Sequence, residues 1–114
     1  MNLEKFTEKA QEAVVLAQQL AIKSDQQQVD AEHLALALVE QEDGLIPRLL
    51  WSLGVNPGDI SRELRQEVDK RPKVYGSAAS EVYATRRFNQ MLLTAEDKAK
   101  KLKDEYVSVE HLFM

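Results

Sequence analysis

The stretch of sequence that decides the fold occurs twice in this chain. Residues 7–34 are TEKAQEAVVLAQQLAIKSDQQQVDAEHL, and residues 85–112 are TRRFNQMLLTAEDKAKKLKDEYVSVEHL. A shift of 78 residues aligns the two copies and gives eight identities among the 36 residue pairs that it allows. The strongest part of the match is the unbroken run Glu-His-Leu at residues 32–34 and 110–112. Self-similarity of this kind indicates one supersecondary unit that is used twice.

Each copy opens with the periodicity of an amphipathic helix. Thr7 and Thr85 are predicted N-caps, because a threonine hydroxyl can accept a hydrogen bond from a free backbone N–H of the first turn. Apolar residues then recur at spacings of three and four, which places them on one face of a helix. The first stripe comprises Ala10, Ala13, Val14, Ala17, Leu20 and Ala21, and the second comprises Phe88, Met91, Leu92, Ala95, Ala99 and Leu102.

Further helices are expected between these two. A second helix should begin after Asp30 and end near Gly44, since glycine adopts the left-handed conformation of a C-cap at low cost. A third is expected over about residues 46–53. A fourth should begin at Asn56 and Pro57, an N-cap followed by proline at the first helical position. The pattern predicts no strand pair, so the expected fold class is all-α.

The repeat divides the single domain of residues 1–114 into three parts. The first repeat covers residues 1–70 and holds four helices, and residues 71–81 form a connector whose proline, glycine and small residues interrupt the helical pattern. The second repeat begins in residues 82–114, where Ser108 is the expected cap of its second helix. By the spacing of the first copy, the second copy would end near position 150. The second repeat is therefore predicted to be truncated.

The composition argues against several classes of function. The formal net charge is −4 and no basic face with interleaved aromatic residues is present, so nucleic-acid binding is not expected. The chain has no cysteine, and therefore neither a disulfide nor a thiolate site. No apolar run approaches the roughly 18 residues of a membrane span, and the N-terminus lacks the apolar core of a signal peptide. A cytoplasmic protein without membrane contact is the default expectation.

The sequence also lacks the patterns of an active site. No combination of nucleophile, base and orienting group occurs, and no G-x-x-x-x-G-K-[ST] loop is present, so the chain is expected to be no enzyme and to hold no cofactor. The two histidines, His33 and His111, do not have the spacing of a zinc site, which favours buried or capping roles without metal. Trp51 is interpreted as a packing residue of the third helix.

Five segments together carry a resemblance to a known family: residues 6–13, 32–34, 49–55, 72–76 and 104–112. They resemble the N-terminal domains of the Clp family of AAA+ unfoldases, and the PKVYG segment of the connector resembles the ClpB branch, the disaggregases, more than the ClpC or ClpA branches. The resemblance covers the whole chain. It implies a pseudo-twofold pair of four-helix units on a flexible linker above a hexameric ATPase ring. ATP and Mg would then belong to the parent protein and not to this chain.

The resemblance also implies a function. The chain would be the substrate- and adaptor-binding domain of an ATP-dependent disaggregase, which recognises unfolded or aggregated proteins and passes them to the ring of a homohexamer. Two alternatives stay open. One is the adaptor-binding domain of a ClpC- or ClpA-type unfoldase that serves a protease, and the other is a stand-alone helical adaptor. A Walker motif downstream in the full reading frame would exclude the second alternative.

The candidate partner-binding residues lie at helix starts and on the second apolar stripe. For Glu32 and Glu110 the simplest role is a favourable interaction of a carboxylate with the helix dipole. In ClpC-type relatives the matching glutamates help to bind phosphorylated arginine, so the resemblance implies that they flank a partner groove. Leu92 is a core residue by its spacing, and the resemblance implies that it lies in an apolar groove between the repeats. The full set is Thr7, Glu32, Thr85, Leu92, Asp104 and Glu110.

Overall fold

The computed structural model describes residues 4–41, 44–71, 83–102 and 106–113. The expected connector, residues 71–81, lies outside the described residues apart from its first member. The elements are α1 (Glu8–Lys23), β1 (Gln28–Val29), α2 (Ala31–Glu40), α3 (Leu45–Ser52), α4 (Pro57–Asp69), β2 (Tyr83–Ala84), α5 (Arg86–Lys101) and α6 (Val109–Phe113). The expected all-α class is confirmed, with two very short strands added.

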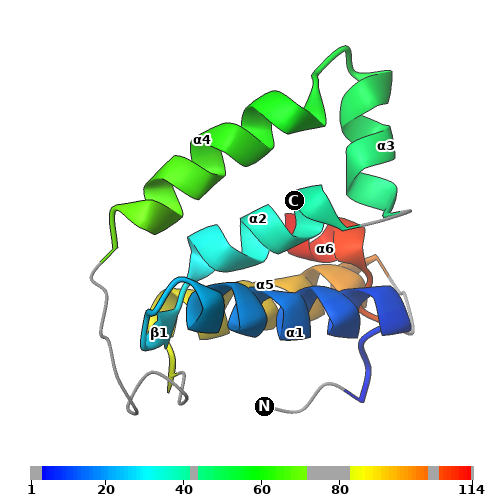
Figure 1. Ribbon diagram of the computed structural model, residues 1–114. Coiled ribbons are helices and arrows are strands. Elements are labelled where there is room, and N and C mark those ends of the chain that lie inside the picture. Colours follow the sequence, from blue (N-terminus) through cyan, green and yellow to red (C-terminus); the bar gives the residue numbers. More distant parts are fainter. Residues whose placement is uncertain (1–3, 42–43, 72–82, 103–105, 114) are drawn as a thin grey trace.

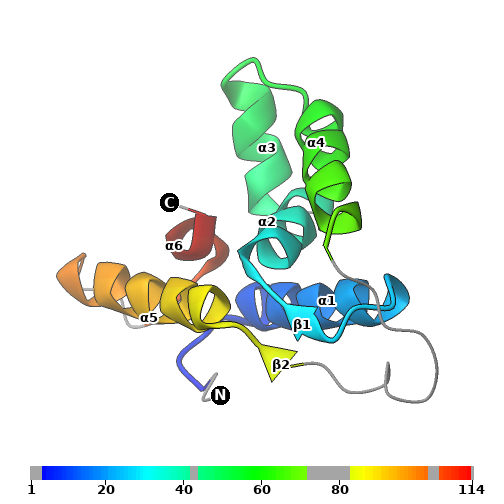
Figure 2. The same ribbon diagram turned by 90° about the vertical axis from the view of Figure 1, so that its left-hand side faces the viewer.

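Helix α2 lies at the centre of the fold. Figures 1 and 2 show α1 on one side of it and the α3–α4 pair on the other, with α5 and α6 continuing the body beside α1. Because helices pack around α2 on several sides, most of its residues are buried. The buried residues are His33, Leu34, Leu36, Ala37, Leu38 and Val39. The face that α1 buries is mostly alanine, which lets neighbouring helices approach closely.

The predicted helix starts are confirmed by their capping hydrogen bonds. Thr7 Oγ1 accepts from the backbone N–H of Ala10 at 3.2 Å, and Thr85 Oγ1 accepts from that of Phe88 at 3.1 Å. Asn56 caps α4 in the same way, with proline at the first helical position. Each bond satisfies one of the N–H groups that a helix start leaves without a partner.

The internal repeat is visible in the backbone. Helix α5 begins and ends 78 residues after α1, and α6 begins 78 residues after α2. The N–H of Thr7 donates to the carbonyl of Val107 at 2.8 Å, and the N–H of Thr85 donates to the carbonyl of Val29 at 3.0 Å. The shift that carries Thr7 onto Thr85 also carries Val29 onto Val107. The two bonds are therefore reciprocal: in each copy, the threonine that caps the first helix donates to the carbonyl of the matching valine of the other copy.

These contacts correct the expectation that the chain has no strand pair. Strands β1 and β2 are parallel, with Gln28 opposite Tyr83 and Val29 opposite Ala84, and a further parallel bridge joins Phe6 to Val107. Strands of two residues are too short to show an alternating pattern. Their pairing follows from how the two copies pack, which a local sequence pattern does not report.

Two details of the first copy also differ from expectation. Helix α2 ends at Glu40, and Gly44 has a φ of −78°, so it caps the start of α3 and is not a left-handed C-cap. Lack of space for a side chain explains why this residue is glycine, because a Cβ here would lie 3.0 Å from the carbonyl oxygen of Gln41. Among the described glycines, the left-handed one is Gly54, after α3. Trp51 is exposed, so its interpretation as a packing residue was wrong.

Candidate functional site

Polar side chains from three parts of the chain meet at the start of α2. We call Asp30, Glu32, Arg71, Thr85 and Arg87 the acid–arginine cluster. Thr85 Oγ1 donates to Asp30 Oδ1 at 2.8 Å, and Arg71 Nη1 lies 2.9 Å from Asp30 Oδ2. Glu32 lies 2.9 Å from Arg87 Nη2 and 3.4 Å from Arg71 Nη1. The cluster therefore joins the starts of α2 and α5 to Arg71, which follows the C-cap of α4.

The two arginines of the cluster differ in their exposure. The side chain of Arg71 is 20% exposed and pairs with the buried Asp30, whereas that of Arg87 is 64% exposed. Solvent weakens the Arg87 pairs, as it does for most exposed ion pairs. Removing the partner of a buried charge is far more costly, because the remaining charge stays desolvated. Arg71 is therefore the structurally important arginine of the cluster.

Asp30 is held in its charged form. Burial acts to raise the pKa of this carboxyl group, but the hydrogen bonds from Ala31 N–H and Thr85 and the charges of Arg71 and Arg87 outweigh it. The pKa of Asp30 therefore lies below its ordinary value. Its ionised side chain stabilises the start of α2 both as a cap and as a negative charge at the positive end of the helix.

Behind the cluster runs a buried chain of hydrogen bonds. The backbone N–H of Asp30 donates to His33 Nδ1 at 2.9 Å, so this nitrogen is unprotonated and Nε2 carries the proton. His33 Nε2 donates to Gln26 Oε1 at 2.6 Å, and Gln26 Nε2 donates to the carbonyl of Val68 at the end of α4. Burial lowers the pKa of His33 and the charge of Arg71 adds to this, while Glu32 and Asp30 oppose it. His33 is a neutral structural histidine.

The expected capping role of the histidines is confirmed at both positions. His111 repeats the arrangement of His33, with its Nδ1 accepting from the N–H of Ser108 at 2.9 Å. Within the described ranges, no group of three or more His, Asp or Glu side chains could hold a metal ion.

Among the predicted partner-binding residues whose side chains the structure describes, Glu32 and Thr85 both belong to the acid–arginine cluster. Thr7 is a half-buried cap of α1, and Leu92 is only 5% exposed and belongs to the core. Asp104 lies outside the described residues, and only the backbone of Glu110, in α6, is described. Their binding roles stay predictions.

Sequence reasoning missed the arginines of the cluster, although one signal was present. Arg86 and Arg87 occupy the first turn of α5, where the helix dipole disfavours positive charge. A basic pair at that position needs nearby carboxylates, and Asp30 and Glu32 supply them for Arg87. Arg71 carried no such signal, because it was assigned to the connector.

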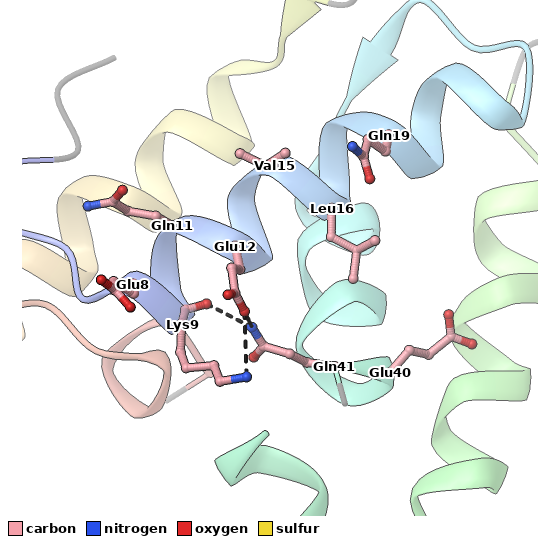
Figure 3. Close-up of a pocket in the computed structure, with 9 residues that line it drawn as sticks. All are labelled: Glu8, Lys9, Gln11, Glu12, Val15, Leu16, Gln19, Glu40 and Gln41. Atoms are coloured by element: carbon pink, nitrogen blue, oxygen red, sulfur yellow. Dashed lines mark hydrogen bonds and ion pairs between the residues drawn. The ribbon is translucent and has the colours of Figure 1, made fainter. Parts of the chain in front are cut away.

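Two grooves flank the body of the fold. The α1 groove, of about 880 Å³, runs along α1 from Glu8 to Gln19 and is closed by Glu40 and Gln41 at the end of α2 (Figure 3). The α5 groove, of about 480 Å³, lies between α5 and α6 and has Met91, Leu112 and Phe113 in its wall. Thr7, Glu32, Thr85 and Leu92 line neither groove.

Comparison with known proteins assigns the chain to a family. The family described as the Clp repeat (R) N-terminal domain matches residues 5–114. The chain belongs to this family. The ClpB chaperone of Nitratidesulfovibrio vulgaris is 50% identical over 115 residues, which cover 99% of this chain, and that of Clostridium perfringens is 43% identical over 116 residues. The chain spans only 13% of the length of either relative.

Solved structures share the fold of this Clp N-terminal domain. The Hsp104 N-terminal domain of Candida albicans superposes with a TM-score of 0.84 at 23% identity, over 96% of this chain and 71% of that one. The N-terminal domain of the E. coli ClpV1 ATPase superposes with a TM-score of 0.85 at 22% identity, over 96% of this chain and 66% of that one. No helix in the described part of the chain is long and apolar enough to cross a membrane.

Proposed function

We propose that this Clp N-terminal domain binds unfolded or aggregated proteins, or an adaptor that carries them, and passes them to the AAA+ ring of a ClpB-type disaggregase. The observation that carries the proposal is the match to ClpB chaperones at 37–50% identity over 96–100% of the chain by relatives from several bacteria. The parent protein would be a cytoplasmic homohexamer that binds ATP and Mg. The chain itself has no phosphate-binding loop, so hydrolysis belongs to the ring.

The repeat structure supports the proposed division of the domain. We assign residues 1–70 to the first repeat, 71–81 to the connector and 82–114 to the start of a second repeat. The matching bounds of α1 and α5 favour this assignment, as do the reciprocal bonds between the copies. A full reading frame that continues with the rest of the second repeat and a Walker motif would support both the division and the disaggregase proposal.

The proposed contact is weak and apolar, and it centres on Leu92, with Thr7, Asp104 and Glu110 at its rim. Because Leu92 is 5% exposed, a client segment reaches it only when neighbouring side chains shift. Such a step lowers the apparent affinity, since only part of the population is competent to bind. Weak capture suits a domain that must release its client to a translocating ring.

The test is a titration of a fluorescently labelled, permanently unfolded protein against the chain and two variants. Leu92→Ala removes the proposed contact, and Leu36→Ala removes a leucine of α2 that is also buried. Both variants lose core packing, so the second controls for general destabilisation. We expect Leu92→Ala alone to weaken binding, by about fivefold or more. Equal weakening by both variants would show that stability, and not a contact at Leu92, controls binding.

A further inference from the structure

We propose that the α1 groove binds a short extended peptide segment in which lysine or arginine stands beside aliphatic side chains. This inference rests on the proposed function. It names a class of client segment and a second place on the domain where such a segment binds. The groove is formed by α1 and the end of α2, and neither Thr7 nor Leu92 lines it.

The size of the α1 groove suits a peptide. Its volume of about 880 Å³ falls within the range of about 300–1,000 Å³ that is usual for ligand pockets. The stretch of α1 from Glu8 to Gln19 rises about 16 Å, at about 1.5 Å per residue. An extended segment of about five residues, at about 3.3 Å each, has the same length.

The charge of the groove favours a cationic occupant. Its wall holds three carboxylates, of Glu8, Glu12 and Glu40. Glu40 is already bound by Arg65, at 2.7 Å. Glu12 pairs with Lys9 at 3.5 Å, but half or more of each side chain is exposed, so an incoming cation can replace this weak pair. Glu8 and Glu12 are therefore the carboxylates that a lysine or arginine of the peptide would contact.

The wall of the groove also offers an apolar contact and an unused hydrogen-bond acceptor. Val15 is 47% exposed and lies next to the half-buried Leu16. Figure 3 shows the Gln41 side chain reaching from α2 to α1 between Lys9 and Glu12. Its Nε2 donates to the carbonyl of Lys9 at 2.8 Å, while its Oε1 is buried and accepts from no donor among the described residues. A peptide N–H that displaces the Lys9 side chain would satisfy this oxygen.

The second copy provides a natural comparison. The shift of 78 residues carries Glu8 onto Arg86 and Glu12 onto Gln90, so α5 lacks both carboxylates. It carries Val15 onto Leu93, which is exposed like its counterpart. The equivalent positions of α5 therefore keep the exposed apolar residue but lack the two glutamates, and variants of α5 serve as matched controls.

The experiment measures fluorescence anisotropy of the labelled pentapeptide LKLRL and of its acidic counterpart LELEL with the 114-residue chain. We expect LKLRL to bind at least about tenfold more tightly than LELEL, and its binding to weaken as salt is raised, because the charges are exposed. Val15→Gln and Glu12→Gln should each weaken LKLRL binding by about threefold to fivefold. The controls Leu93→Gln and Asp97→Asn, on α5, should leave it unchanged.

Equal binding of the two peptides, or equal weakening by the α1 and α5 variants, would overturn the proposal. The titration with unfolded protein separates this result from the proposed function. If the chain binds unfolded protein through Leu92 but does not bind LKLRL, the groove proposal alone is wrong. If the chain binds LKLRL in the α1 groove but binds no unfolded protein, the groove proposal stands and the proposed function fails.

Discussion

Replacing His33 by leucine is expected to lower the free energy of unfolding by about 2–6 kcal/mol. Leucine is close to histidine in volume, so the space stays filled. It makes neither of the two hydrogen bonds, and the N–H of Asp30 and Oε1 of Gln26 then lose their partners. Both residues are buried, so water does not replace what is lost. Each unsatisfied buried group costs about 1–3 kcal/mol, and the two together give the expected range.

The measurement is urea unfolding followed by circular dichroism at a pH above 7, where histidine is neutral. The matched variant is His111→Leu, because His111 accepts the equivalent bond from the N–H of Ser108 at 2.9 Å. Ser108 is only half-buried, so water can replace part of that bond, and we expect a loss of about 1 kcal/mol. If the two variants lose the same free energy, the buried chain from Asp30 to Val68 does not stabilise the fold as argued.

Three further predictions concern the same core and the chemistry of the chain. Because the pKa of His33 is lowered on folding, the unfolded chain binds a proton at this histidine before the folded chain does as the pH falls below about 6.5. Urea unfolding at a series of pH values should therefore show that the free energy of unfolding of the wild type falls by up to about 1.4 kcal/mol per pH unit more than that of His33→Gln. In urea unfolding Arg71→Ala should cost about 2–3 kcal/mol, and Arg87→Ala less than about 1 kcal/mol. A coupled phosphate-release assay should detect no ATP hydrolysis by the purified chain, because it has no phosphate-binding loop; turnover above a mock preparation would contradict this.

The sequence predicted the helices well because their signals are local. Thr7, Asn56 and Thr85 cap helices from adjacent positions, and a stripe such as that of α1 needs only its own spacing. Gly44 was misinterpreted because two different constraints select glycine, and only the structure shows that close approach to Gln41 is the one acting.

The candidate site was harder to predict because it depends on contacts between distant segments. Asp30 and Thr85 are 55 residues apart, and nothing in either neighbourhood indicates that a hydrogen bond joins them. The repeat indicated that the two copies are equivalent, but not that their short strands pair with each other. The exposure of Leu92 likewise depends on how α5 packs, and a helical stripe alone does not separate a core leucine from a groove leucine.

The reciprocal bonds between the copies also determine when parts of the fold can form during synthesis of the chain. The N–H of Thr7 donates to the carbonyl of Val107, so this bond in front of α1 can form only after 100 further residues have been synthesised. At about 5–20 residues per second a ribosome needs several seconds for that length. During this interval the nascent first copy can form its helices but not the bridge to Val107, which leaves Phe6 without the neighbour that it has in the finished fold. A nascent domain of this kind would itself expose, for about 5–20 seconds, the sort of apolar segment that chaperones recognise.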